Sequence, residues 1–213
     1  MSPLAEALLW IAICLVSGSI PYSVIIARAV TKSDLSDVGD GNPGATNVIA
    51  SAGLGWGIVA GLLDGFKAAI PIGIAKFVIG IDGWALVAAS IAPLLGHAYS
   101  PFLKFKGGKA VASTFGTWCG LTIWEGPTVM GIMLGYWYSS VRVSGWAVLF
   151  TMISLLAYFV FAARIDWVMG VVWVLNAALL AWRYREDLQQ PPGVHEWVER
   201  LARRLRPGKQ AAS

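Results

Sequence analysis

Seven apolar runs separated by short polar loops make up most of this chain. They lie at roughly 5–28, 53–79, 84–102, 110–124, 127–141, 144–162 and 165–182. A bilayer-spanning helix needs about 20 mostly apolar residues, and most of these runs approach that length. Only 13% of the residues are charged, whereas soluble domains carry about 25%. The sequence therefore predicts an all-α integral membrane protein of about seven transmembrane helices, folded as a single domain over 1–213 with a basic tail at 183–213.

The fourth and fifth runs are short, and only Glu125, Gly126 and Pro127 separate them. They are alternatively interpreted as a re-entrant hairpin, which leaves six full spans. Pro71 is expected to kink the long second run, because proline removes a helix hydrogen bond. The first run has no basic residue ahead of it, so it is interpreted as a retained membrane helix rather than a secretory signal.

The orientation follows from the lysines and arginines, because cytoplasmic loops are enriched in them. With seven spans, 13 of the 16 basic residues fall on one side of the membrane. They are Arg28, Lys32, Lys104, Lys106, Lys109, Arg142, Arg183, Arg185, Arg200, Arg203, Arg204, Arg206 and Lys209. Lys76 and Arg164 fall on the other side, and Lys67 lies within the second span. The prediction is an N-terminus outside the cell and a C-terminus in the cytoplasm.

The loop GDGNPGATN, from Gly39 to Asn47, follows the first apolar run directly. Its glycines, asparagines and threonine present N–H groups, amides and a hydroxyl with little side-chain bulk in the way. Such a loop is typical of a phosphate site. By the orientation above, it faces the cytoplasm.

A second motif, KFKGGK, runs from Lys104 to Lys109 and precedes the next apolar run. Two glycines at a helix N-terminus are expected to leave free N–H groups, and the three lysines add positive charge around them. The motif predicts an anion site on the same membrane face as the first loop. The alternative is a lysine-rich cytoplasmic loop that only reflects topology.

Asp64 and Lys67 are three residues apart inside the second span, where an unpaired charge is costly. We expect them to pair, either as a structural ion pair or as part of a polar, catalytic cavity. His97 ends the third span, close in sequence to the KFKGGK loop. It is interpreted either as a packing residue or as a substrate contact at the mouth of that cavity.

Several kinds of catalytic motif are absent from the sequence. There is no His-x-x-x-x-Asp pair, no serine nucleophile elbow, no Walker loop and no Cys/His cluster with metal spacing. Cys14 and Cys119 lie in apolar runs and are interpreted as small buried hydrophobic residues. A reaction here must rely on positioning and electrostatics, which suits a substrate that already carries an activated leaving group.

Taken together and in order, these motifs resemble the bacterial acyl-phosphate-dependent glycerol-3-phosphate acyltransferases, the PlsY type. The matching segments are GSIPYS (18–23), GNPGATNV (41–48), Asp64 with Lys67, Gly96 with His97, FKGGK (105–109) and Arg183. The resemblance implies seven spans, an outside N-terminus and a cytoplasmic active site. It also implies transfer of a fatty acyl group from acyl phosphate to the sn-1 hydroxyl of glycerol 3-phosphate, giving lysophosphatidate for phospholipid biosynthesis.

The resemblance assigns roles to individual residues. The catalytic residues implied are His97, Asn42 and Thr46, and the substrate- and phosphate-binding residues are Gly41, Gly44, Asn47, Lys104, Gly107, Gly108, Lys109 and Arg183. A substrate phosphate can act as the proton acceptor in such enzymes. No metal and no cofactor is implied. The expected partners are the two substrates, the anionic lipid bilayer and an acyl-phosphate-producing enzyme, in the bacterial plasma membrane.

The chain departs from the family pattern within the motifs. It has Ser36 and Ala50 where arginine is usual, Asp40 where serine is usual, and Ala110 in place of a glycine. Two guanidiniums suited to phosphate are thus missing and a carboxylate is added. A divergent member with a different acceptor, or without activity, is therefore an alternative. A small transporter or lipid-binding protein with Asp64 and Lys67 along a permeation path is another.

The tail segment 195–206 places Trp197, Val198, Leu201 and Leu205 on one helical face and arginines around the other. This pattern predicts a helix that lies on an anionic membrane surface. The alternative is a plain solvated tail.

Overall fold

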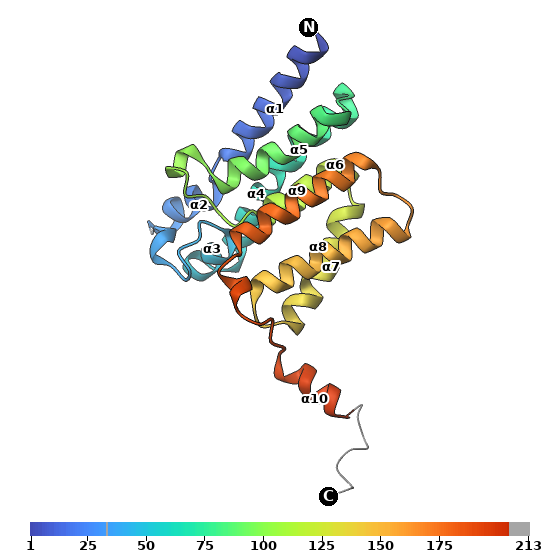
Figure 1. Ribbon diagram of the computed structural model, residues 1–213. Helices are drawn as coiled ribbons and strands as arrows, with labels where there is room; N and C mark the ends of the chain where they lie inside the picture. Colours follow the sequence, from blue (N-terminus) through green and yellow to red (C-terminus); the bar gives the residue numbers. More distant parts are fainter. Residues whose placement is uncertain (33, 205–213) are drawn as a thin grey trace, which may run out of the picture.

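The computed structural model describes residues 1–32 and 34–204, and in this part of the chain all regular structure is helical (Figure 1). The α-helices are α1 (Pro3–Ser19), α2 (Tyr22–Thr31), α3 (Ala45–Ala52), α4 (Leu54–Ile74), α5 (Gly83–Ala98), α6 (Val111–Thr122), α7 (Glu125–Ser140), α8 (Ser144–Phe161), α9 (Trp167–Arg183) and α10 (Glu196–Arg204). The predicted all-α class is confirmed.

Four helical segments among the described residues are long and apolar enough to cross a bilayer. They are Pro3–Thr31, Leu54–Ile79, Gly83–Leu103 and Ser144–Phe161. Helix α9 is apolar but shorter. Helices α6 and α7 match the two short runs in the sequence. Length and composition alone therefore do not decide between six and seven crossings.

The sequence predicted one continuous helix for the first apolar run, but the run breaks between α1 and α2. Pro21 has no N–H to donate, and the residue before a proline is disfavoured in the helical conformation. Ile20 accordingly has an extended backbone, with φ −64° and ψ 122°. The break leaves the Ile20 carbonyl without a helical donor, and the Lys67 ammonium donates to it at 2.7 Å. The Tyr22 N–H also donates to this carbonyl, at 3.2 Å.

Pro71, by contrast, does not end its helix. Helix α4 continues to Ile74 and then widens into a single π-helical turn at Ala75–Ile79.

Helix α4 packs closely against α6 through small residues. A Cβ built on Gly116 would lie 2.0 Å from the Gly65 carbonyl oxygen, so only glycine allows this approach. On its other side, α6 is joined to α9 by a buried amide. Asn176 accepts a hydrogen bond from Trp118 Nε1 at 3.2 Å and donates to Thr114 Oγ1 at 3.0 Å. These contacts fix α6 between two neighbours.

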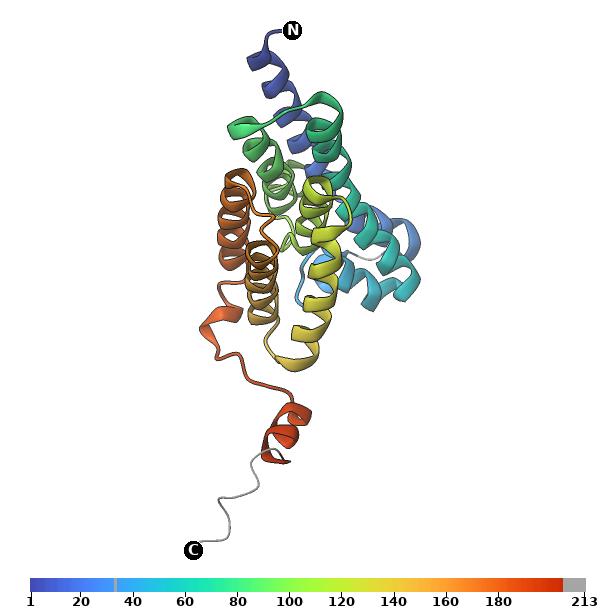
Figure 2. The same ribbon diagram turned by 90° about the vertical axis from the view of Figure 1, so that its right-hand side faces the viewer.

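The chain after α9 crosses beneath the bundle and then leaves it, so that α10 stands away from the other helices (Figures 1 and 2). Its start is tied to the α7–α8 turn: the His195 N–H donates to the Ser140 carbonyl at 3.0 Å, and Trp197 Nε1 to the Ser139 carbonyl at 2.6 Å. The predicted tail helix is thus present over Glu196–Arg204. Leu205, Arg206 and Lys209 lie outside the described residues.

Candidate functional site

A cavity of about 770 Å³ opens between the α2–α3 loop and helices α4, α6 and α7. Its polar end is lined by Asp40, Asn42, Thr46, Asn47, Asp64, His97, Lys109, Tyr138 and Tyr184. Its apolar end is lined by Leu62, Phe66, Ala69, Phe115, Cys119, Pro127 and Leu134. The cavity thus joins a polar compartment at the loop end of the bundle to an apolar wall made by three helices.

The α2–α3 loop is shaped by one buried side chain, Asn47. Its Nδ2 donates to the Val38 carbonyl at 2.8 Å, the Asp40 carboxylate at 2.9 Å and the Asn42 carbonyl at 3.0 Å. Asn47 lies in the first turn of α3, so the helix holds the loop in place. Asn47, predicted to bind substrate, thus uses its amide nitrogen to hold the loop, and it lines the cavity together with Asn42 and Thr46.

Lys109 lies at the centre of the polar end. Its Nζ is 3.1 Å from Asp40 Oδ2, 3.9 Å from Asp187 Oδ1 and 4.7 Å from the centroid of the Tyr184 ring. Burial raises the pKa of the Tyr184 phenol, which therefore stays protonated. Lys109 is the cation best placed to meet an anion that enters the cavity.

The pKa of Asp40 reflects two opposing effects. Burial raises it, but hydrogen bonds from the Asn42 N–H, Lys109 and the Asn47 amide, together with the Lys109 charge, outweigh burial. The pKa therefore lies below its ordinary value of 3.8. Asp40 is a carboxylate at neutral pH.

The sequence predicted free N–H groups at the two glycines of the KFKGGK motif, and this prediction is wrong. The Gly107 N–H donates to the Ala98 carbonyl at 3.2 Å, and the Gly108 N–H to the His97 carbonyl at 3.1 Å. The physical need for glycine is close packing instead, since a Cβ on Gly108 would lie 2.3 Å from His97 Nε2. The turn thus positions His97 and delivers Lys109 to the cavity.

Asp64 lies in the middle of a buried polar network that joins four helices. It accepts from Lys67 Nζ at 2.7 Å and from Ser23 Oγ at 2.5 Å. Ser113 Oγ donates to its backbone carbonyl at 3.1 Å. His97 Nδ1 is 3.9 Å from Asp64 Oδ1 and has no hydrogen-bond partner among the described residues. Asp64 and His97 both line the cavity, so this network forms part of its wall.

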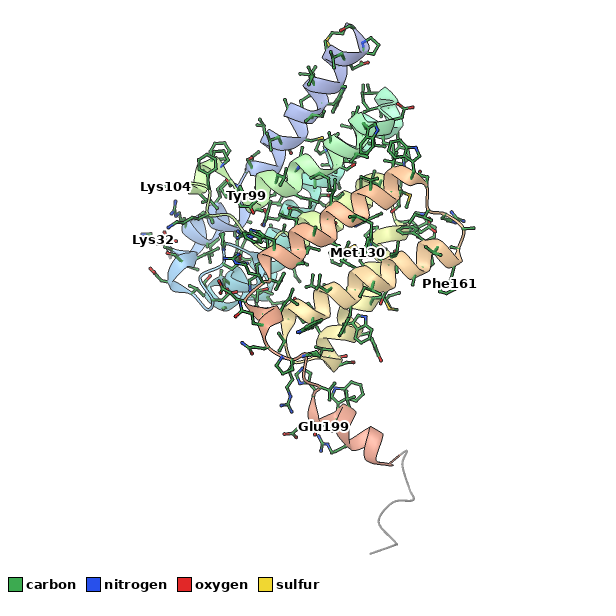
Figure 3. The ribbon with its side chains drawn as sticks, viewed as in Figure 1. Lys32, Tyr99, Lys104, Met130, Phe161 and Glu199 are labelled. Carbon is green, nitrogen blue, oxygen red and sulfur yellow. The ribbon has the colours of Figure 1, made fainter. Side chains whose placement is uncertain are left out.

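Arg183 and Lys104 do not line the cavity. Arg183 Nη2 donates to the Gly107 carbonyl at 2.6 Å, and its guanidinium lies over the Tyr99 ring. Lys104 is exposed at the outer edge of the α5–α6 loop, while Tyr99 begins that loop at the end of α5 (Figure 3). The geometry thus gives Arg183 a contact that holds the glycine turn, and it leaves Lys104 outside the polar end.

The predicted site residues did not include Ser23, Asp40, Tyr138, Tyr184 or Asp187, and Asp40 was noted only as a departure from the family pattern. Ser23 lies in the first turn of α2, after the proline break and within the GSIPYS motif, and that position is a usable signal. Tyr184 and Asp187 come from the chain after α9, and Tyr138 from α7. Tyr184 and Asp187 follow Arg183 in a tail motif of the family pattern, whereas no such motif marks Tyr138.

Comparison with known proteins identifies the family to which this fold and site belong. The family model for glycerol-3-phosphate acyltransferase matches residues 8–191. This chain belongs to the glycerol-3-phosphate acyltransferase family.

Two relatives with the same family name align with different lengths of this chain. Glycerol-3-phosphate acyltransferase 1 of Thermotoga maritima is 47% identical over 124 residues, which cover 56% of this chain and 60% of the relative. Glycerol-3-phosphate acyltransferase of Thermosipho melanesiensis is 39% identical over 178 residues, covering 81% of this chain and 82% of the relative.

Solved structures of a glycerol-3-phosphate acyltransferase share the fold. The crystal structure of PlsY, an integral membrane glycerol 3-phosphate acyltransferase, in its glycerol 3-phosphate form has a TM-score of 0.77 and 30% identity. The aligned part covers 92% of this chain and 98% of the PlsY chain. A second PlsY structure, in its lysophosphatidic acid form, has a TM-score of 0.74 and 31% identity over 86% of this chain and 90% of that one. The chain is thus a multi-pass membrane protein of the glycerol-3-phosphate acyltransferase family.

Some departures from the glycerol-3-phosphate acyltransferase motifs lie away from the cavity, and others line it. Ser36 is exposed and bonded to Asp34, and Ala50 is exposed on α3; neither lines the cavity. Asp40 and Ala110 do line it. Ala110 also has φ +66°, a conformation in which glycine carries no penalty. The departures that affect this site directly are therefore those at 40 and 110.

Proposed function

We propose that this protein transfers a fatty acyl group from acyl phosphate to the sn-1 hydroxyl of glycerol 3-phosphate, producing lysophosphatidate. The observation that carries this proposal is that one cavity has both a cationic, hydrogen-bonding end and an apolar wall. Lys109 offers a charge for phosphate, and the face formed by Phe66, Phe115 and Leu134 offers a surface for an acyl chain. Each substrate carries a phosphate and one reacting group, which is the acyl carbonyl in acyl phosphate and the sn-1 hydroxyl in glycerol 3-phosphate.

The proposed reaction needs no covalent enzyme intermediate. The acceptor hydroxyl attacks the carbonyl carbon of the acyl phosphate, a new C–O bond forms, and the acyl–phosphate C–O bond breaks. The hydroxyl proton passes to a substrate phosphate, which replaces a protein base. The protein contributes orientation and charge: Lys109 neutralises phosphate, Asn42 and Thr46 contact the substrates, and His97 supports the wall next to Gly108.

We also propose seven crossings, with the N-terminus outside and the C-terminus in the cytoplasm. Support comes from the α6–α7 turn, which meets the far ends of α4 and α8. Lys76 Nζ donates to the Leu121 carbonyl at 2.7 Å, and Arg164 Nε is 3.4 Å from Glu125. The short pair therefore extends as far as its longer neighbours rather than turning back at mid-depth. The cavity mouth and 13 of the 16 basic residues then face the cytoplasm.

In this orientation both substrates arrive from the cytoplasmic side of a bacterial plasma membrane. Acyl phosphate is an activated mixed anhydride, so a separate enzyme must produce it. The protein then performs the first acylation of phospholipid biosynthesis, and the membrane receives the product. It requires no metal or cofactor for this reaction.

The test is acyl transfer by purified protein supplied with acyl phosphate and glycerol 3-phosphate. Wild type should release lysophosphatidate, and Lys109→Ala should lose most of this activity because phosphate loses its nearest cation. Lys106→Ala is the matched control: Lys106 belongs to the same loop but is exposed and outside the cavity lining. No lysophosphatidate from wild type above a protein-free control would refute the proposal, and full activity in Lys109→Ala would refute the role of Lys109. Equal losses in the two variants would refute the role of Lys109.

A further inference from the structure

The donors at the polar end of the cavity are already occupied by a carboxylate from within the chain. Asp40 Oδ1 accepts from the Asn42 N–H at 3.1 Å and from Asn47 Nδ2 at 2.9 Å. Asp40 Oδ2 lies 3.1 Å from Lys109 Nζ. A backbone N–H, an amide and an ammonium are the donors that a phosphate oxygen would use. Asp40 therefore holds the position that an anionic ligand would take.

A second carboxylate increases the negative charge around Lys109. Asp187 Oδ1 lies 3.9 Å from Lys109 Nζ, and Asp187 Oδ2 accepts from the Gly145 N–H at 3.0 Å. One ammonium thus faces two carboxylates. A phosphate dianion that approaches Lys109 meets net negative charge, because like charges at this distance repel. Binding requires at least one carboxylate to move away.

Asp40 is the more exposed of the two carboxylates. Its side chain is 53% exposed, compared with 25% for Asp187, so water can solvate it once it leaves Lys109. Asp187 is held by its bond to Gly145 at the start of α8, and a Cβ on Gly145 would lie 2.7 Å from the Asp187 side chain. Asp40 lies in the loop before α3, outside the helices of the bundle, whereas movement of Asp187 would break its contact with the start of α8.

We propose that Asp40 is an internal competitor for the phosphate position, and that a phosphate-bearing substrate binds by displacing its carboxylate from Lys109. Asp40 is thus a specificity-determining residue that weakens the binding of dianionic substrates. The choice of glycerol 3-phosphate as that substrate rests on the proposed function. The competition itself follows from the contacts of Asp40 and applies to any phosphate.

The experiment replaces Asp40 with a neutral residue and measures binding and catalysis separately. Asp40→Asn preserves the size of the side chain, and Asp40→Ser keeps a short acceptor for the Asn42 N–H. Binding is measured by titration calorimetry with inorganic phosphate as the probe, and catalysis by KM and kcat for glycerol 3-phosphate. Asp37→Asn is the matched control, since Asp37 is an exposed acid of the same loop outside the cavity lining.

Both Asp40 variants should lower the KM for glycerol 3-phosphate and the Kd for phosphate by about tenfold, a factor that corresponds to roughly 1.4 kcal/mol. Asp37→Asn should leave both values as in wild type. An unchanged or raised KM and Kd in both Asp40 variants, at an unchanged thermal midpoint, overturns the inference. An equal decrease of KM and Kd in Asp37→Asn also overturns the inference, because the loss of any negative charge from the loop would then explain the effect.

The outcome for this inference can be separated from that for the proposed function. If no variant forms lysophosphatidate but Asp40→Asn binds phosphate more tightly than wild type, the proposed function fails and the competition stands. If acyl transfer occurs and phosphate affinity does not respond to Asp40, the competition fails and the proposed function stands.

Discussion

Substituting Gly108 with alanine tests whether the glycine turn positions His97. The new Cβ would lie 2.3 Å from His97 Nε2 and 3.2 Å from Cδ2 and Cε1 of the same ring. These atoms must separate by roughly 1 Å to reach ordinary contact in a close-packed interior. The ring has little room to move, because His97 is only 8% exposed and faces Asp64. Gly108 is also held in place by its N–H bond to the His97 carbonyl.

We expect Gly108→Ala to destabilise the protein by about 1–3 kcal/mol, the usual cost of overpacking. A displacement of this size near a reaction centre can lower the rate about 100-fold. The assays are kcat/KM for acyl transfer and the midpoint of thermal unfolding in detergent. Gly135→Ala is the matched control: Gly135 is in α7, a Cβ there has no neighbour within 4 Å, and alanine favours the helix. Wild-type kcat/KM and an unchanged midpoint for Gly108→Ala would refute the positioning role.

Three further outcomes are expected. Asp64→Asn leaves the buried Lys67 ammonium without its carboxylate and should lower the free energy of unfolding by about 3–5 kcal/mol. The double variant Asp64→Asn/Lys67→Met should recover part of the unfolding midpoint. An Asp64→Asn protein as stable as wild type would contradict this. Asn176→Ala removes the partners of Trp118 and Thr114 and should cost about 1–3 kcal/mol, while kcat of the folded protein is unchanged because Asn176 lies outside the cavity. The pKa of Asp40 is lowered, so the stability that its ionised form contributes is present above pH 3.8 and lost only as pH falls through the folded pKa. The ratio of the KM values of wild type and Asp40→Asn should therefore be the same at pH 7 and pH 8, and a changing ratio would show that another group titrates.

The helical membrane class could be predicted from the sequence because it depends on local properties. Long apolar runs need only be counted along the chain, and the second run, 53–79, agrees closely with Leu54–Ile79. The break at Pro21 is also a local effect, yet it was missed because the apolar run continues across it. The residues on either side are apolar enough that hydropathy alone indicates one helix.

The candidate site could be predicted only in part. The loop around Asn47 and the segment around Lys109 stand out because glycine-rich, polar stretches are unusual beside apolar runs. The hydrogen-bond partners of their backbone N–H groups could not be predicted. Whether the N–H groups of Gly107 and Gly108 are free depends on the carbonyls of Ala98 and His97, which reach them only when the chain folds back after α5.

By itself, then, the sequence determined that this chain is a helical membrane protein with two glycine-rich polar loops, because hydropathy and glycine content are properties of single segments. The tertiary structure alone decided which groups meet. Asp40 reaches Lys109 across 69 positions of sequence, and Ser23 reaches Asp64 across 41. These contacts depend on the packing of α4 against α6 and on the break between α1 and α2. Whether Lys109 meets a substrate or a carboxylate of its own chain is therefore set by packing, since charges interact according to their distance in space.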